Sequence, residues 1–270
     1  MTTHTTNSPP PELAEAEDGV GARMSLLEHL GELRRRLFRA LLGVIVGTTI
    51  GVFFAAEVLD FLIQPYCGIE KVAERVSESE PCRFLVLGPT GGIVSYFRVS
   101  LLVGASLAIP ILTYQLLMFV LPGLRRREKR WLLSSLPAVT ALFVVGVAFS
   151  WYVLIPPALG FLGGFQPTIF KPEWTADLYL SFVTTLLFWM GAAFQTPLVF
   201  FILALLGLVQ ARTLVRNWRL AIVGAAFAAA IITPTIDPVN MLLVMGPLLV
   251  LYALSVLLVV VGARLNGVNR

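Results

Sequence analysis

Long apolar runs constrain this sequence more than any other feature. Four of them are each long enough to cross a hydrocarbon layer, which takes about 20 residues of helix; they lie at residues 37–56, 99–121, 132–155 and 178–208. Only 13% of the residues are charged and the mean hydropathy is +0.84, whereas a soluble domain carries roughly 25% charge. One buried core cannot hold this much apolar surface, so we predict an all-α protein that crosses a membrane several times.

Two further apolar runs bring the prediction to six transmembrane helices. The fifth span, about 218–232, contains only 13 consecutive apolar residues, and the sixth covers 239–262. At 1.5 Å per residue the fifth run reaches about 20 Å, which is about 10 Å less than the hydrocarbon thickness. We therefore expect a thin flank at these two spans, where the connecting turn lies in an interfacial notch and partner helices dock.

Lysine and arginine are distributed unequally over the two sides of the predicted spans. Fifteen lie on the side that carries both termini and five on the other side. Because cytoplasmic loops carry an excess of these residues, both termini are predicted to be cytoplasmic. Residues 1–23 are polar and acidic and are expected to form a disordered tail, followed by one membrane domain at 24–265 and a short C-terminal tail at 266–270.

The sequence offers little material for catalysis or for a cofactor. Its two histidines lie far from any cysteine pair, and Arg39 is the only charged residue within the apolar runs of the predicted spans. We expect no catalytic residues, no metal, no cofactor and no nucleic-acid partner. A secondary transporter or carrier of small solutes is the alternative function. It is disfavoured because the spans lack ionisable residues for a relay and matching broken helices in the two halves.

Cys67 and Cys82 both fall in the first predicted external loop. That compartment is oxidising, so we predict a disulfide between them. Apolar residues between the two cysteines recur at helical spacing, which predicts a short amphipathic helix near the membrane surface. Two free thiols are the alternative.

Two acidic residues lie among the many bases on the cytoplasmic side. Glu32 belongs to a predicted amphipathic helix at residues 25–37, and Glu128 is a single acid among five bases between the second and third spans. Ordinary roles are open to both residues. Glu32 can pair with Arg36 one helical turn away, and Glu128 can compensate the N-terminal dipole of the third span.

The two stretches that hold these acids resemble motifs of the TatC family, a subunit of the Tat protein translocase. Members carry H-L-x-E-L-R-x-R-L before the first span, here His29 to Leu37, and F-x-x-P-x-L-x-x-x-E-[RK]-R between the second and third, here Phe119 to Arg130. Further similarity, covering residues 24 to 262 in all, lies at Pro65, Tyr114-Gln115, Phe194-Gln195-Thr196-Pro197, Thr233-Pro234 and Asp237. The external cysteine pair is similar to that of actinobacterial members.

The resemblance implies Sec-independent protein export and recognition rather than catalysis. TatC proteins of the bacterial cytoplasmic membrane bind twin-arginine signal peptides of folded proteins and organise single-span TatA-type and TatB-type partners, together with further TatC copies. By resemblance, Glu32 and Glu128 each hold a signal arginine, and Arg34, Phe119 and Pro122 shape the site. A carboxylate accepts a guanidinium through two charge-assisted hydrogen bonds, a geometry that lysine cannot reproduce.

The sequence also departs from the family pattern. Gln195 stands where the family usually has a glutamate in the fourth span, and Leu117 replaces an aromatic residue. An amide is less costly inside a membrane than a carboxylate and can both donate and accept. We expect Gln195, Gln115 and Asp237 to form polar sites for partners, with the alternative that Gln195 faces only its own bundle.

Overall fold

The computed structural model describes residues 26–67, 83–120, 126–166, 168–169, 174–205, 207–235 and 237–265. These residues are almost entirely helical, with one isolated bridge between Leu85 and Thr175. The elements are α1 (Leu26–Leu62), α2 (Gln64–Cys67), α4 (Gly91–Val120), α5 (Arg126–Phe149), the π-helix η1 (Ser150–Leu154), α6 (Ile155–Gly164), α7 (Ala176–Ala193), α8 (Thr196–Leu205), α9 (Ala211–Arg216), α10 (Trp218–Ile232) and α11 (Pro238–Leu265).

The all-α membrane prediction is confirmed. Within the described ranges, five helical segments are long and apolar enough to cross a membrane, and α10 is a shorter apolar helix. The first segment starts well before residue 37, because the predicted amphipathic helix continues into the span without a break as α1. The other long segments cover Gly91–Phe119, Leu136–Gly164, Ala176–Leu205 and Pro238–Ala263.

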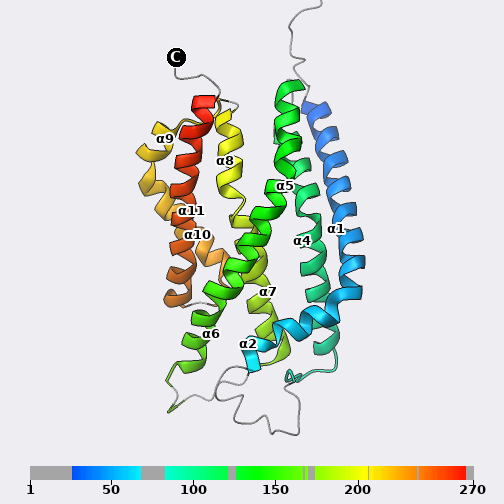
Figure 1. The fold of residues 1–270 in the computed structure, drawn as a ribbon. Helices are drawn as coiled ribbons and strands as arrows, with labels where there is room; N and C mark the ends of the chain where they lie inside the picture. The colour runs from blue at the N-terminus through cyan, green and yellow to red at the C-terminus, as the bar shows by residue number, and fades with distance from the viewer. Residues whose placement is uncertain are drawn as a thin grey trace, which may run out of the picture.

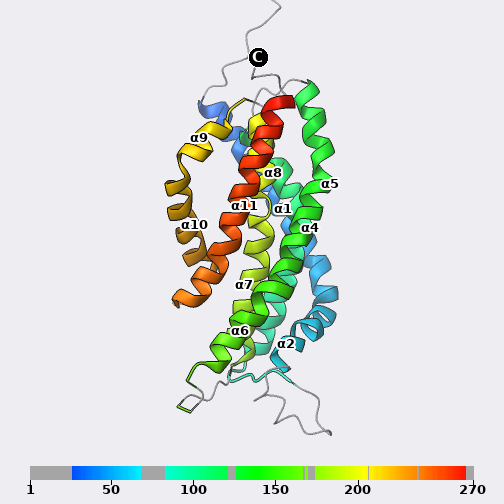
Figure 2. The same cartoon turned by 60° about the vertical axis from the view of Figure 1, so that its left-hand side comes forward.

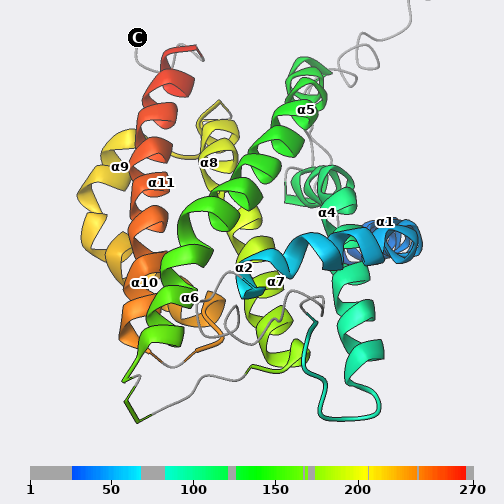
Figure 3. The ribbon, with the colours of Figure 1, turned by 60° about the horizontal axis from the view of Figure 1, so that its bottom comes forward.

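The helices α1 and α4 run side by side along most of their length (Figures 1 and 3). Small residues form the contact: a Cβ atom added at Gly47 would collide with the backbone of Gly104, and one added at Gly51 would collide with the backbone of Ser100. Without side chains between them, the two backbones approach closely, which is a common way for helices to associate in membranes. This contact fixes the position of α1 against the rest of the bundle.

The third long segment is α5, η1 and α6 joined end to end, and it crosses α7 obliquely (Figure 1). In η1 the Ile155 N–H donates to the Ser150 carbonyl, five residues back instead of four. Pro156 and Pro157 follow at once and have no N–H to continue an α-helical ladder, which explains the irregular turn here. Trp151 of η1 stacks on Phe61 of α1, with ring centroids 4.5 Å apart.

The fourth predicted span is two helices rather than one. α7 ends at Ala193 and α8 begins at Thr196, with Phe194 and Gln195 in a turn between them. Pro197 lies in the first turn of α8, where a missing N–H is tolerated, so the helix restarts there. The sequence carries no charged residue across this break, and apolar residues dominate on both sides of it, which is why hydropathy alone predicted a single helix.

The largest apolar cluster lies at the end of the bundle away from the start of α1, around Tyr179 (Figure 1). The Tyr179 hydroxyl donates to the Leu62 carbonyl at 2.8 Å, and the Tyr66 hydroxyl donates to the Trp174 carbonyl at 3.2 Å. The Tyr66 and Tyr179 rings meet edge to face, with centroids 5.3 Å apart. Only smaller clusters lie towards the opposite end of the described helices, so this end holds the long helices together.

The flank formed by α10 and α11 is shorter than the rest. α10 has 15 residues, which corresponds to about 22 Å of helix. In Figures 1 and 2 the turn between α10 and α11 lies well before the far end of α6. α1 and the α10–α11 pair lie at opposite edges of the molecule, with α4, α5 and α7 between them (Figure 3).

Candidate functional site

The two predicted arginine-binding acids belong to helices that begin at the same end of the molecule. The start of α1, the start of α5 and the C-terminal end of α11 all lie at the upper end in Figures 1 and 2. Glu32 lies in the second turn of α1, and Glu128 lies in the first turn of α5. The Glu128 side chain is outside what the structure describes.

Glu32 is engaged on one oxygen only. Arg36 Nε donates to Glu32 Oε1 at 2.9 Å, and Arg36 Nη2 contacts the same oxygen. Both side chains are mostly covered, with 19% of Glu32 and 16% of Arg36 exposed. The Oε2 atom of Glu32 is buried and has no hydrogen-bond partner among the described residues. The ordinary i,i+4 pair is therefore present, and the second carboxylate oxygen has no hydrogen-bond partner among the described residues.

The other predicted contributors to the site are less informative. Arg34 is exposed on α1, and Phe119 is half-buried near the end of α4. Pro122 lies outside the described residues. Their predicted roles stay predictions.

The two glutamines have buried, unused acceptors. Gln195 is 8% exposed, and its Nε2 donates to the Val139 carbonyl of α5 at 3.0 Å. The Oε1 atoms of Gln195 and Gln115 are buried without a partner in the described part of the chain. Gln195 thus uses a donor inside its own bundle, while its acceptor has no partner among the described residues; its role towards partners stays a prediction.

Asp237 caps α11. Its Oδ1 accepts the Asn240 N–H at 2.7 Å and its Oδ2 accepts the Asn240 Nδ2 at 3.0 Å, and Pro238 follows as the first helical residue. This is a typical N-cap arrangement. Burial alone raises the pKa of the Asp237 carboxyl, but the hydrogen bonds from Asn240, Thr235 and Val239 together outweigh it, and the pKa lies below its ordinary value. Both oxygens are used within the chain.

Cys67 closes α2, and it is disulfide-bonded. Cys82 and the short helix predicted between the two cysteines lie outside the described residues. The pairing of these two cysteines stays a prediction. Among the residues that the structure covers, no group of three or more His, Cys, Asp or Glu side chains is placed to hold a metal ion.

Comparison with known proteins decides the family. The family described as "Sec-independent protein translocase protein (TatC)" matches residues 28–247. The chain belongs to the TatC family. A TatC protein of Synechocystis is 35% identical over 243 residues, which is 90% of each chain, and one of Koribacter versatilis is 34% identical over 233 residues, covering 86% of this chain and 84% of that one.

A longer relative and a solved structure agree with this assignment. The chloroplastic TatC protein of Pisum sativum is 36% identical over 229 residues, and the chain spans 62% of its length. A crystal structure described as the twin arginine translocase receptor TatC superposes with a TM-score of 0.73 at 33% identity and covers 87% of this chain and 100% of that one. The resemblance to TatC and the multi-pass membrane character are confirmed. These names describe a translocase component rather than a classical enzyme, and they give no support to a small-solute carrier.

The structure also shows two features of this TatC-family chain that the sequence did not indicate. The short helix α9 lies between α8 and α10, and the Tyr252 hydroxyl of α11 donates to the Leu214 carbonyl of α9 at 2.8 Å. Residues 209–219 carry three arginines, which belong to the predicted cytoplasmic excess of basic residues. The contact joins residues 38 positions apart, so no local pattern could have revealed it.

Proposed function

We propose that this TatC-family protein is the receptor subunit of a Sec-independent translocase. It binds the twin-arginine signal peptides of folded proteins through Glu32 and Glu128. It also serves as a scaffold for TatA-type and TatB-type single-span subunits and further TatC copies. The observation that carries the proposal is the buried Oε2 of Glu32, a carboxylate oxygen without a partner among the described residues. The structural relative described as a twin-arginine translocase receptor supports the same reading.

Arg36 illustrates what the Glu32 site can hold. Its guanidinium contacts Glu32 Oε1 through two nitrogens, which is the kind of group that a signal arginine would present. An i,i+4 pair of this kind is worth only about 0.3–0.5 kcal/mol, whereas hydrogen bonds to charged groups are worth about 1.5–3 kcal/mol. A signal arginine that takes the place of Arg36 can therefore gain more than the lost pair contributed, and one that binds Oε2 requires the side chains that cover this oxygen to move.

In the proposed placement the protein is a multi-pass component of the bacterial cytoplasmic membrane with both termini in the cytoplasm. The 15-to-5 distribution of Lys and Arg supports this orientation. The starts of α1 and α5 and the end of α11 share one end of the bundle (Figure 1), which becomes the cytoplasmic end that meets the signal peptide.

The α10–α11 flank is the proposed docking surface for partner helices. α10, with 15 residues, is shorter than a hydrocarbon layer of about 30 Å, so the bilayer is compressed beside it. Gln195 lies between α7 and α8 and bonds to α5 rather than to this flank; its Oε1, which has no partner among the described residues, is proposed as a separate acceptor for a polar residue of a partner helix. Both features favour single-span partners over soluble ones.

The proposal is tested by Glu32→Ala and Glu128→Ala. Each removes the partner of a guanidinium, so export of a folded reporter with a twin-arginine signal should be lost while membrane insertion stays intact. Glu57→Ala, which removes an exposed acid from the other end of α1, is the matched control and should export normally. Normal crosslinking of an Arg-Arg signal peptide to the Glu128→Ala protein would contradict the assignment.

A further inference from the structure

The short helix α9 presents arginines that have no acidic partner. Arg212 and Arg216 lie one turn apart on α9, Arg219 lies at the start of α10, and all three are exposed. No Asp or Glu occurs anywhere between Asp177 and Asp237. Within the described ranges none of the three arginines forms an ion pair. Among the described residues, this surface therefore carries positive charge without an acidic side chain paired to it.

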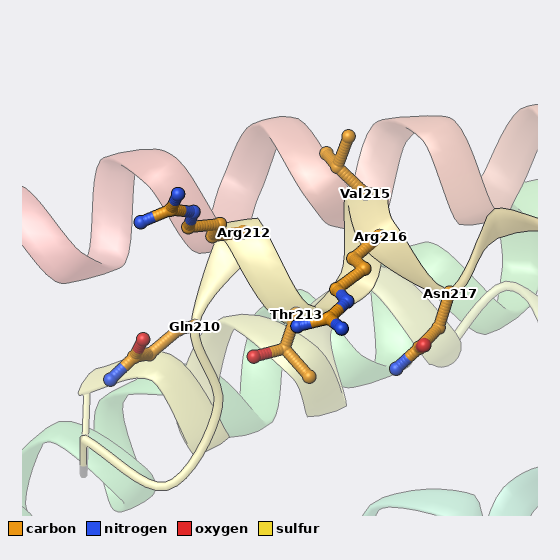
Figure 4. Close-up of a pocket in the computed structure, with 6 residues that line it drawn as sticks. All are labelled: Gln210, Arg212, Thr213, Val215, Arg216 and Asn217. Carbon is orange, nitrogen blue, oxygen red and sulfur yellow. The ribbon is translucent and has the colours of Figure 1, made fainter.

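Arg212 and Arg216 line an open cavity of about 950 Å³. Figure 4 shows the Arg216 guanidinium over Thr213, with the Arg212 and Gln210 side chains pointing away from it at the other end of the short helix. Two guanidinium groups, two amides and a hydroxyl thus share one cavity, lined by Gln210, Arg212, Thr213, Val215, Arg216 and Asn217. All of these polar groups can donate hydrogen bonds, which is the chemistry that recognises a phosphate.

The position of α9 is fixed by contacts on its opposite face. Leu214 is buried against Ala204 of α8 and Val259 of α11, and the Tyr252 hydroxyl donates to the Leu214 carbonyl at 2.8 Å. Because the inner face is held in this way, Arg212 and Arg216 project outwards from a fixed backbone. The cavity does not have to be assembled when a ligand arrives, which favours binding.

The surroundings of the cavity point to a lipid. α9 connects two apolar helices, α8 and α10, so it lies at a membrane surface whichever way the protein is oriented. Leu208, Val215 and Trp218 are exposed beside the arginines, and Arg219 lies over the Trp218 ring at 5.6 Å. Tryptophan with arginine at the end of a span is typical of the headgroup level of a bilayer. Apolar side chains next to a phosphate-binding cavity suit a molecule that has both a phosphate and acyl chains.

We propose that the α9 cavity binds the headgroup of an anionic phospholipid. Arg212 and Arg216 hold the phosphate, Gln210, Thr213 and Asn217 donate further hydrogen bonds, and the acyl chains lie against Trp218 and the exposed face of α10. Basic pockets at the ends of membrane helices are known to select anionic headgroups. The site is at the far flank from Glu32 (Figures 1 and 3), so it is independent of signal-peptide binding.

The test measures lipid binding to the purified full-length protein by native mass spectrometry. Dioleoyl phosphatidylglycerol and dioleoyl phosphatidylcholine share acyl chains and differ in net charge, and inorganic phosphate in excess serves as competitor without acyl chains. The variants are R212Q/R216Q and a matched control, R35Q/R39Q, which removes two exposed arginines with the same spacing from α1. The quantity compared is the ratio of the two lipid dissociation constants, because that ratio does not depend on the fraction of protein that is folded.

The wild type should prefer phosphatidylglycerol, R212Q/R216Q should lose this preference by on the order of tenfold, and R35Q/R39Q should keep it. Equal losses in both double variants would mean diffuse attraction to the charged end of the protein and would overturn the proposal. Equal binding of both lipids by the wild type would overturn it as well. Complete displacement of phosphatidylglycerol by inorganic phosphate would assign the cavity to free phosphate instead of a lipid.

Discussion

Glu32→Gln separates the charge of the carboxylate from its shape. In the wild type, Glu32 accepts Arg36 on Oε1 and keeps Oε2 unpaired and buried. A signal arginine gains charge-assisted hydrogen bonds worth about 1.5–3 kcal/mol, less about 0.3–0.5 kcal/mol if it displaces Arg36. The difference is about 1–2.7 kcal/mol, so Glu32→Gln should weaken binding of a twin-arginine signal peptide roughly 5- to 100-fold.

Arg36→Gln should have the opposite sign. It removes the group that competes for Glu32, so the affinity for the same peptide should rise by about twofold, corresponding to the 0.3–0.5 kcal/mol of the i,i+4 pair. Arg35→Gln removes an exposed neighbouring charge and controls for a general change in the charge of α1. Affinities are measured with a fluorescent signal peptide and purified protein in nanodiscs. Unchanged affinity for Glu32→Gln, or equal weakening by the Glu32 and Arg36 variants, would refute this reasoning.

Three further predictions concern the fold. Gly51→Leu should lower the free energy of unfolding, measured by thermal unfolding in detergent, by about 1–3 kcal/mol or more, because the new side chain collides with the α4 backbone. Gly224→Leu is the control and should leave the stability unchanged, because the space around Gly224 is open. Asp237→Ala should lower the free energy of unfolding by about 0.5–2 kcal/mol, because the helix cap is lost. Since the folded-state pKa of Asp237 is lowered, the cap stabilises the protein above the ordinary aspartate pKa, and this stabilisation is lost as pH falls through the folded-state pKa. A variant whose stability falls with acid as much as that of the wild type would contradict this role. Reduction of a Cys67–Cys82 disulfide should cost up to about 3 kcal/mol, and equal thiol labelling with and without reductant in intact cells would show that the pair does not exist.

The sequence was sufficient to predict the helical segments, because burial in lipid requires an apolar side chain at almost every position of a span. It did not reveal where those segments break. Pro156, Pro157 and Pro197 are visible in the sequence, but a continuous apolar run conceals whether a proline bends a helix, begins one or is accommodated by a π turn. The position of the breaks depends on packing between α5 and α7, where Gly146 and Gly191 let the helices cross closely.

The candidate site was predictable to a different degree at each residue. The Glu32–Arg36 pair follows from i,i+4 spacing alone, and the capping role of Asp237 follows from the proline after it. The bond from Gln195 to the Val139 carbonyl joins residues 56 positions apart, and the bond from Tyr252 to Leu214 likewise depends on how α11 lies against α9. Such contacts are set by tertiary structure, so local patterns could not indicate that the Gln195 donor is used or that the α9 arginines project from a fixed backbone.

The central claim is that carboxylates of this TatC-family chain recognise a pair of guanidinium groups. The most direct test is the affinity of the purified wild-type protein for a twin-arginine signal peptide compared with its Lys-Lys version, at the same charge and ionic strength. Because lysine cannot form the two-pronged hydrogen bond with a carboxylate, the account predicts binding of the Arg-Arg peptide at least about tenfold tighter. Equal affinity for the two peptides would show that charge alone attracts the signal, and it would contradict the account.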